Sequence, residues 1–236
     1  DPTVDSQMVT LKASGADLFY NITTPKFGAQ AIKKAAELGW KPVQILDINA
    51  TPVSQTLIPA GLENAKGIIS VNYGKDPLDP QWANDEGMKR YKAFMAKYAP
   101  AEDANSGIAT YGYSTASLFV QIIKQCGDDL TRANIMKQAT NIKDFVADLA
   151  LPGMTTSTTP DDWRINKQFQ MMKFDGQRWF LFWPILTDEF KTDCSFRVRS
   201  DHFKLHRRYR RCDRALCGVH AVRACGVDSI LVLLDD

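Results

Sequence analysis

Residues 17–46, DLFYNITTPKFGAQAIKKAAELGWKPVQIL, decide the fold of this chain. The apolar run 17–22 is typical of a short strand, and 43–46 predicts a second one. Between them, Thr24 and Pro25 suit the N-cap and first position of a helix, and Gly39 suits its end. Two strands joined through one helix indicate a parallel pair with a right-handed crossover.

The same alternation continues on both sides of this stretch. A helix over 4–13 precedes it, and a short helix over 54–62 and a third strand over 67–71 follow it. Two prolines within 75–84 break the pattern and predict a crossover. The sequence up to this point therefore predicts an α/β fold with a parallel sheet flanked by helices.

Three helical stretches and a hairpin occupy the next part of the chain. Apolar spacing predicts helices over 85–98, 113–126 and 131–140. Residues 151–160 read as extended. The arms of 168–184 flank Asp175-Gly176, which predicts a β-hairpin with a type I′ turn.

Ligands of open parallel sheets bind at the carboxyl ends of the strands. That rule selects Asn21, Thr23 and Thr24 after the first strand, and Asp47 and Asn49 after the second. The first loop also opens a helix, whose free N–H groups favour an anion. Purely structural roles remain open: Thr24 as a helix cap, Asn21 and Thr23 as turn residues, and Asp47 and Asn49 as solvated loop residues.

Two tyrosines are further candidates. Tyr111 and Tyr113 are expected to open a helix after an extended 108–110 segment. Their hydroxyls could line a cleft, with Tyr111 as the candidate ligand contact, although aromatic residues at a helix start more often pack into a core.

Catalytic patterns are missing from residues 1–190. This stretch holds no His, no nucleophile-elbow motif and no glycine-rich phosphate loop. Its 19 basic and 21 acidic side chains give a net charge of −2, which offers no electrostatic case for nucleic acid. We therefore expect a binding module rather than an enzyme, with no catalytic residue, metal or cofactor.

The tail, residues 191–236, has a different composition. It holds all three His and four of the five Cys, with 8 Arg against 2 Lys. Three interpretations stay open: a metal site among the Cys and His of 212–225, a basic arm over 204–211, or the product of a frameshift in GC-rich DNA. The third is favoured, and with it a disordered tail.

Several stretches resemble one family in order along the chain. They include residues 29–42 (AQAIKKAAELGWKP), 60–67 (AGLENAKG), 79–82 (DPQW) and 174–179 (FDGQRW). They are similar to the substrate-binding proteins of branched-chain amino acid ABC transporters, of the Leu/Ile/Val-binding type. The resemblance runs over about residues 1–185.

The resemblance implies a partial type I periplasmic binding fold, of which this chain is the C-terminal half. A signal peptide and the front half would precede Asp1 in a full family member. Residues 1–74 would continue the second lobe, 75–150 would return to the first lobe, and 151–190 would form the hinge and hairpin. Residues 191–236 lie beyond the resemblance.

The implied function is that of the periplasmic solute-binding component of an ABC importer. The implied ligand is an amino acid or a small carboxylate, including aromatic ones. The partner is the permease and ATPase complex, through which alone the protein would meet the membrane. Two alternatives remain: a ligand-sensing domain of the same fold in a receptor or regulator, and a nucleic-acid or zinc-binding protein acting through the tail.

The resemblance also bears on the candidate residues. The two loops selected above coincide with ligand-contact loops of the family's second lobe. An acidic residue after the second strand meets the ligand ammonium there; Asp47 is the nearest match, and the alignment also allows Ile48 or Asn49. The first-lobe loop that holds the ligand carboxylate in the family is not in this sequence.

Overall fold

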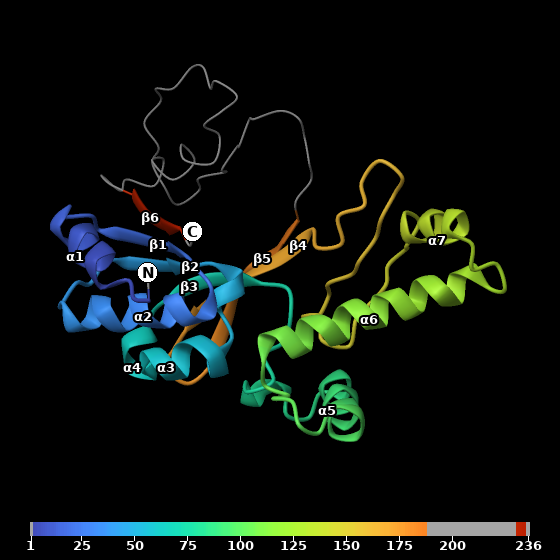
Figure 1. Cartoon of the computed structure of the whole chain (residues 1–236), viewed down its shortest axis with the longest axis horizontal. Helices are drawn as coiled ribbons and strands as arrows, with labels where there is room; N and C mark the ends of the chain where they lie inside the picture. The colour runs from blue at the N-terminus through green and yellow to red at the C-terminus, as the bar shows by residue number, and fades with distance from the viewer. Residues whose placement is uncertain (1, 188–229, 235–236) are drawn as a thin grey trace, which may run out of the picture.

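The computed structural model describes residues 2–187 and 230–234 and is built on one six-stranded sheet (Figure 1). The strand order is β5-β4-β3-β2-β1-β6. Neighbouring strands from β6 to β3 are parallel, and β4 and β5 form an antiparallel hairpin that pairs with β3. The bounds are β1 (Leu18–Ile22), β2 (Val43–Leu46), β3 (Ile69–Asn72), β4 (Gln168–Phe174), β5 (Trp179–Thr187) and β6 (Ile230–Leu234). The expected α/β fold is confirmed.

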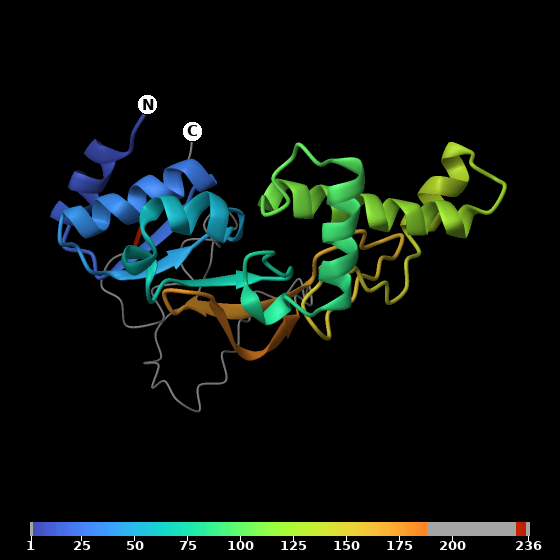
Figure 2. The ribbon, with the colours of Figure 1, turned by 90° about the horizontal axis from the view of Figure 1, so that it is seen from below.

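Helices cover one side of this sheet, as Figure 2 shows for α1, α2 and α3. Ile32 of α2 is fully buried against Leu46, Leu57 and Phe174, and this cluster forms the main core. A second cluster joins α1 to α2 around Met8. The bounds are α1 (Asp5–Ala13), α2 (Pro25–Glu37), η1 (Ile48–Ala50), η2 (Val53–Leu57), α3 (Ile58–Ala60) and α4 (Leu62–Ala65).

Three further helices lie apart from the sheet (Figure 1). They are α5 (Glu86–Tyr98), α6 (Gly107–Cys126) and α7 (Arg132–Ala139), preceded by the short η3 (Pro80–Trp82). Tyr91 of α5 is fully buried and its ring meets the Tyr113 ring of α6 edge to face, with centroids 5.1 Å apart. Ile122 of α6 packs with Ile142 beside α7. The three helices thus have small cores of their own.

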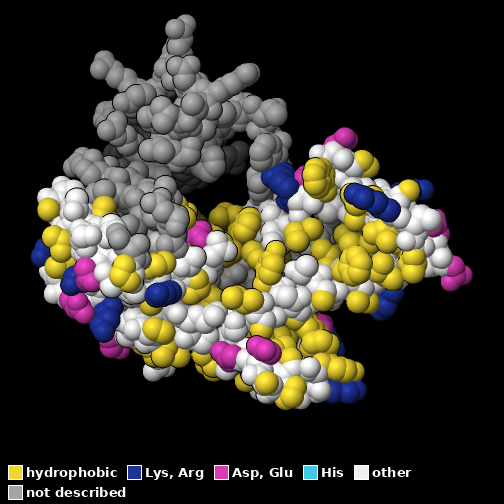
Figure 3. Space-filling view, in the orientation of Figure 1, with side chains coloured by type: hydrophobic (Ala, Val, Ile, Leu, Met, Phe, Trp, Pro, Cys, Tyr) yellow, Lys and Arg dark blue, Asp and Glu magenta, His cyan; other side chains and the backbone are white. Residues whose placement is uncertain are grey.

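Helix α6 also carries exposed apolar side chains. Ile108, Tyr111, Phe119 and Val120 are each more than half exposed. The helix carries no charged side chain before Lys124. Figure 3 shows hydrophobic side chains gathered over this part of the molecule.

The start of α6 differs from the sequence expectation. The helix begins at Gly107, so 108–110 are helical rather than extended, and Tyr111 and Tyr113 lie inside the helix. The Ser106 hydroxyl accepts a hydrogen bond from the Ile108 backbone N–H, which satisfies one of the free donors of the first turn. At the start of α7, the Thr131 hydroxyl likewise accepts a hydrogen bond from Asn134 N.

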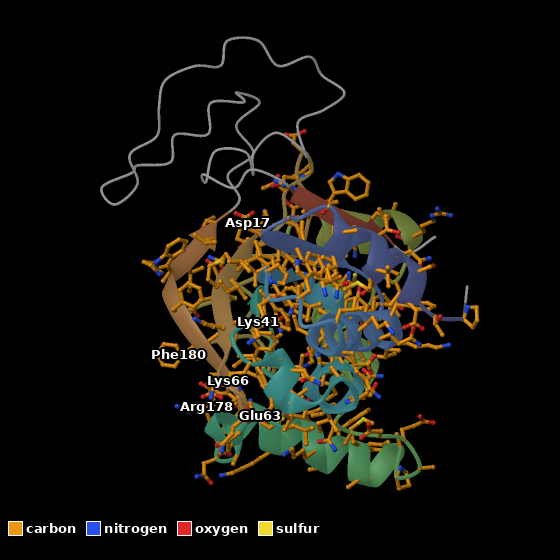
Figure 4. All side chains as sticks on the ribbon, turned by 90° about the vertical axis from the view of Figure 1, so that its left-hand side faces the viewer. Asp17, Lys41, Glu63, Lys66, Arg178 and Phe180 are labelled. Carbon is orange, nitrogen blue, oxygen red and sulfur yellow. The ribbon has the colours of Figure 1, made fainter. Side chains whose placement is uncertain are left out.

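The hairpin is confirmed, but its turn is longer than a two-residue type I′ turn. Phe174 pairs with Trp179, so four residues connect the strands, and Asp175 does not have the positive φ that a type I′ turn needs. The Asp175 carboxylate instead accepts hydrogen bonds from the backbone N–H of Gln177 and Arg178, each at 2.8 Å. Figure 4 shows Arg178 beside Glu63 and Lys66, where the turn meets α4.

Most of the tail lies outside the described residues. This includes the Cys and His of the possible metal site and the basic stretch 204–211. The expected disorder does not hold for Ile230–Leu234, which pairs in parallel with all five residues of β1. The run is apolar and includes Ile and Val, and pairing satisfies backbone groups on the β1 edge.

The described residues were also searched for membrane-spanning helices and for groups of metal-binding side chains. Over residues 2–187 and 230–234, no helix combines the length and apolar character needed to cross a bilayer. The same residues contain no group of three or more His, Cys, Asp or Glu that could hold a metal ion.

Two glycines in helices give opposite expectations for stability. A Cβ on Gly87 would lie 2.1 Å from the backbone oxygen of Asp148, whereas a Cβ on Gly112 would have no atom within 4 Å. We expect Gly87→Ala to lower the free energy of unfolding by roughly 1–3 kcal/mol through overpacking. Gly112→Ala should raise it by about 0.5–1 kcal/mol through helix propensity. Urea denaturation of both variants checks this, and equal effects would contradict it.

Candidate functional site

Buried hydrogen bonds fix the loop after β1. The Thr23 hydroxyl donates to the Asn21 carboxamide oxygen at 2.7 Å, and both residues are almost fully buried. The backbone oxygen of Asn21 accepts from Asp47 N at 2.8 Å, which ties this loop to the one after β2. The Asn21 Nδ2 is buried without a hydrogen-bond partner among the described residues. Thr24 takes the N-cap position of α2, yet its side chain makes no cap hydrogen bond.

The loop after β2 is organised by Asp47. Its Oδ1 accepts from the backbone N of Asn49 at 3.0 Å and from the Asn49 Nδ2 at 2.8 Å. This Asx-type contact caps the short η1. The Asp47 carboxylate therefore fixes the position of the Asn49 side chain.

A cleft of about 680 Å³ lies where the ends of β2 and β3 approach α6. Its volume is within the range of small-molecule sites. Asn49 and Tyr111, from the two sides, both line it, whereas Asn21, Thr23, Thr24 and Asp47 do not. The structure thus brings two of the six predicted residues to the cleft and places the other four in or beside the loops behind Asn49.

Backbone hydrogen bonds join the two sides of the cleft at its base. Lys75 N donates to Leu149 O at 2.8 Å, and Leu151 N donates to Tyr73 O at 2.9 Å. Gly74 and Ala150 form an isolated antiparallel bridge between them. The two segments that connect the sheet with the helical region, 73–75 and 149–151, therefore lie side by side.

A second set of contacts closes one end of the cleft. The Ser54 hydroxyl donates to Asn105 O at 2.9 Å, and the Gln55 side-chain oxygen accepts from Gly107 N at 3.0 Å. The Gln55 carboxamide thereby caps α6 from another part of the chain. A Cβ on Gly107 would lie 2.5 Å from the Pro52 Cγ, which shows how closely the segments approach.

Aromatic rings from separate segments line the cleft. Tyr73, just after β3, meets Phe169 of β4 edge to face with centroids 6.0 Å apart. Burial and the nearby Tyr111 hydroxyl raise the pKa of Tyr73. Phe145 completes this set of aromatic lining residues. Such a surface suits a planar or apolar solute body.

Among the described residues, three charged side chains line the cleft: Lys75, Asp76 and Lys167. The Lys75 ammonium is bound by the Asp85 carboxylate at 2.8 Å and by Asp148 O at 3.0 Å. The Asp76 carboxylate accepts from the backbone N–H groups of Val53 and Leu78. Burial raises the pKa of Asp76.

Sequence reasoning missed several of these lining residues. Asn72 and Tyr73 follow the third strand, so the strand-end rule would have selected them had it been applied there. Lys167 and Phe169 come from the segment before and within the hairpin, and no local pattern in the sequence marks them.

Comparisons with known proteins agree with this architecture. A model of the family described as periplasmic binding protein matches residues 2–178. A search of curated protein sequences returned no match.

Solved structures share the fold at low identity. A branched chain amino acid ABC transporter protein from Thermus thermophilus with bound valine is 15% identical, with a TM-score of 0.67 over 79% of this chain and 50% of that one. A leucine binding protein from Thermotoga maritima is 14% identical, with a TM-score of 0.55 over 80% and 49%. An ABC transporter substrate binding protein from Aeropyrum pernix is 12% identical, with a TM-score of 0.64 over 81% and 50%. This chain spans about half the length of each.

The capping role of Asp47 can be tested by substitution. Asp47→Ala removes the acceptor of both Asn49 contacts, so we expect it to lower the free energy of unfolding by about 1 kcal/mol. Asp47→Asn keeps a side-chain oxygen and should retain most of that stability. Urea denaturation of both variants checks this. An equal loss in the two variants would instead indicate that the charge, rather than the acceptor, matters.

Proposed function

The chain belongs to the periplasmic binding protein family, and we propose that it acts as the extracytoplasmic solute-binding component of an ABC importer. The observation that carries this proposal is the cleft of about 680 Å³ between the sheet and α6. Its base is formed by paired chain crossings, which suit a hinge between two bodies that close on a solute. The family has a solute-binding fold and is normally extracytoplasmic. As part of the same proposal, this protein lies in the periplasm and is not an enzyme.

The proposal includes a division into lobes, which the same crossings support. Residues 1–74 are assigned to the second lobe and 75–150 to the first, with 151–190 as hinge and hairpin. The contacts at 73–75 and 149–151 support these boundaries. Strand β4 of the hairpin pairs with β3, so the hairpin extends the sheet of the proposed second lobe.

We propose the ligand contacts from where the candidate residues lie relative to the cleft. Asn49 and Tyr111 meet the solute directly from opposite sides, because both line the cleft. Asp47 holds Asn49 in place. The buried Asn21 and Thr23, with Thr24 at the start of α2, support that loop from behind. The solute is an amino acid or a small carboxylate, and the partner is a permease and ATPase complex.

Affinity of this chain for such solutes should be low. This chain spans about half the length of the solved structures that it matches, so we expect it to make only part of the contacts that hold a solute in a protein of that length. Calorimetry with leucine and with benzoate should show binding weaker than micromolar. A micromolar dissociation constant, which corresponds to about −8 kcal/mol, would contradict this expectation.

Gene context separates import from sensing. An importer component should be encoded beside genes for a permease and an ATPase. Sequencing of the DNA around this reading frame tests this, and also reads the bases near codon 190 for a frameshift. A kinase or DNA-binding domain fused to this frame would favour a sensory or regulatory domain instead.

A further inference from the structure

Three consecutive residues of η2 each make one hydrogen bond to the part of the chain beyond β3, residues 75–150. Val53 N donates to Asp76 Oδ2 at 2.9 Å, the Ser54 hydroxyl donates to Asn105 O at 2.9 Å, and Gly107 N donates to Gln55 Oε1 at 3.0 Å. Each of these bonds uses a side chain, whereas backbone groups alone join 73–75 to 149–151. Rotation of side chains can therefore release the η2 bonds while the backbone pairing stays intact.

The segment 52–55 also fits closely against the start of α6. A Cβ on Gly107 would lie 2.5 Å from the Pro52 Cγ and 3.3 Å from the Pro52 Cβ. The proline ring has a fixed φ and cannot swing aside as a long side chain would. Gly107 does not have a positive φ, so the close approach is what requires glycine there. A larger residue at this position would force the two sides of the cleft apart.

The arrangement of η2 carries a cost of its own. It is a π-helical turn in which Ile58 N bonds to Val53 O, and such turns are rare and frequent at functional sites. Thr56 within it is fully buried, and its hydroxyl has no hydrogen-bond partner among the described residues. A buried hydroxyl without a partner disfavours the arrangement that holds it. The bonds to 75–150 offset this cost, so η2 has reason to relax once they break.

We propose that residues 52–55 form a latch that holds the cleft closed when no solute is present. The three latch bonds break together as the two sides swing apart about 73–75 and 149–151, which stay paired. The inference rests on the proposed solute-binding function and adds regulation to it. Because a solute enters through the open form, the latch sets the fraction of molecules that can take one up.

Amide hydrogen exchange in the ¹⁵N-labelled full chain measures the latch without any solute. Ser54→Ala removes one latch bond but leaves the Gly107 N–H bonded to Gln55. If the latch bonds break together, this change should speed exchange at Gly107 about fivefold, as expected for loss of one neutral hydrogen bond. The amides of Lys75 and Leu151, which pair across the hinge, should exchange at unchanged rates.

A wedge at the contact tests the opening itself. Gly107→Ala places a methyl group against Pro52, whereas the control Gly112→Ala adds the same group to the same helix with no atom within 4 Å. Nitroxide labels at Lys33 and Lys137, both exposed, report the distance between the two sides by double electron–electron resonance. A keto amino acid carries each label, which avoids the five cysteines of the chain. We expect a longer distance in Gly107→Ala and an unchanged one in Gly112→Ala.

The outcomes separate the latch from general stability and from the proposed function. Equal distances in the two glycine variants would overturn the latch, as would an unchanged Gly107 exchange rate in Ser54→Ala. Equally faster exchange at the hinge amides would overturn it too, because it indicates a general loss of stability. If Gly107→Ala lacks a native circular dichroism spectrum, Gln55→Ala replaces it in the distance measurement. Both readouts are taken without solute, so a failed latch leaves the proposed function standing, and solute titration tests that function separately.

Discussion

The two backbone hydrogen bonds between 73–75 and 149–151 are the constraint on which the arrangement of this molecule depends. They hold the exit from β3 beside the return from the helical region, so the sheet and α6 meet at a fixed place. Tyr73 and Lys75 lie within this junction, and the cleft opens directly beside it. Because backbone groups make the junction, most side-chain changes along it would leave the pairing possible.

Around this junction, chemical roles divide between the two sides. The sheet side contributes amide and carboxylate groups at strand ends, with Asp47 orienting Asn49. The helical side contributes aromatic and apolar surface from α6, including Tyr111. The Ser54 and Gln55 contacts to 105–107 then tie the sides together at one end. A solute between them would touch groups from segments that lie far apart in the chain.

Much of this could be predicted from sequence, and the limits have physical reasons. The pattern in 17–46 predicts β1, α2 and β2 because each buries its apolar face locally. The start of α6 was misplaced although Ser106 offers a local N-cap, and Gln55, 52 residues away, adds an acceptor for Gly107 that no local pattern marks. Asn49 could be selected by the rule that ligands bind at the carboxyl ends of parallel strands, because it lies just after β2. Lys167 could not, because its place at the cleft depends on the pairing of β4 with β3.

The exposed apolar side chains of α6 have a consequence for the protein in a cell. About 18 Å of helix, from Ile108 to Val120, presents Ile, Tyr, Phe and Val side chains to water. Chaperones and quality-control proteases recognise exposed apolar surface of this kind in incompletely buried chains. These exposed apolar side chains are therefore expected to make the chain prone to self-association or to binding by chaperones.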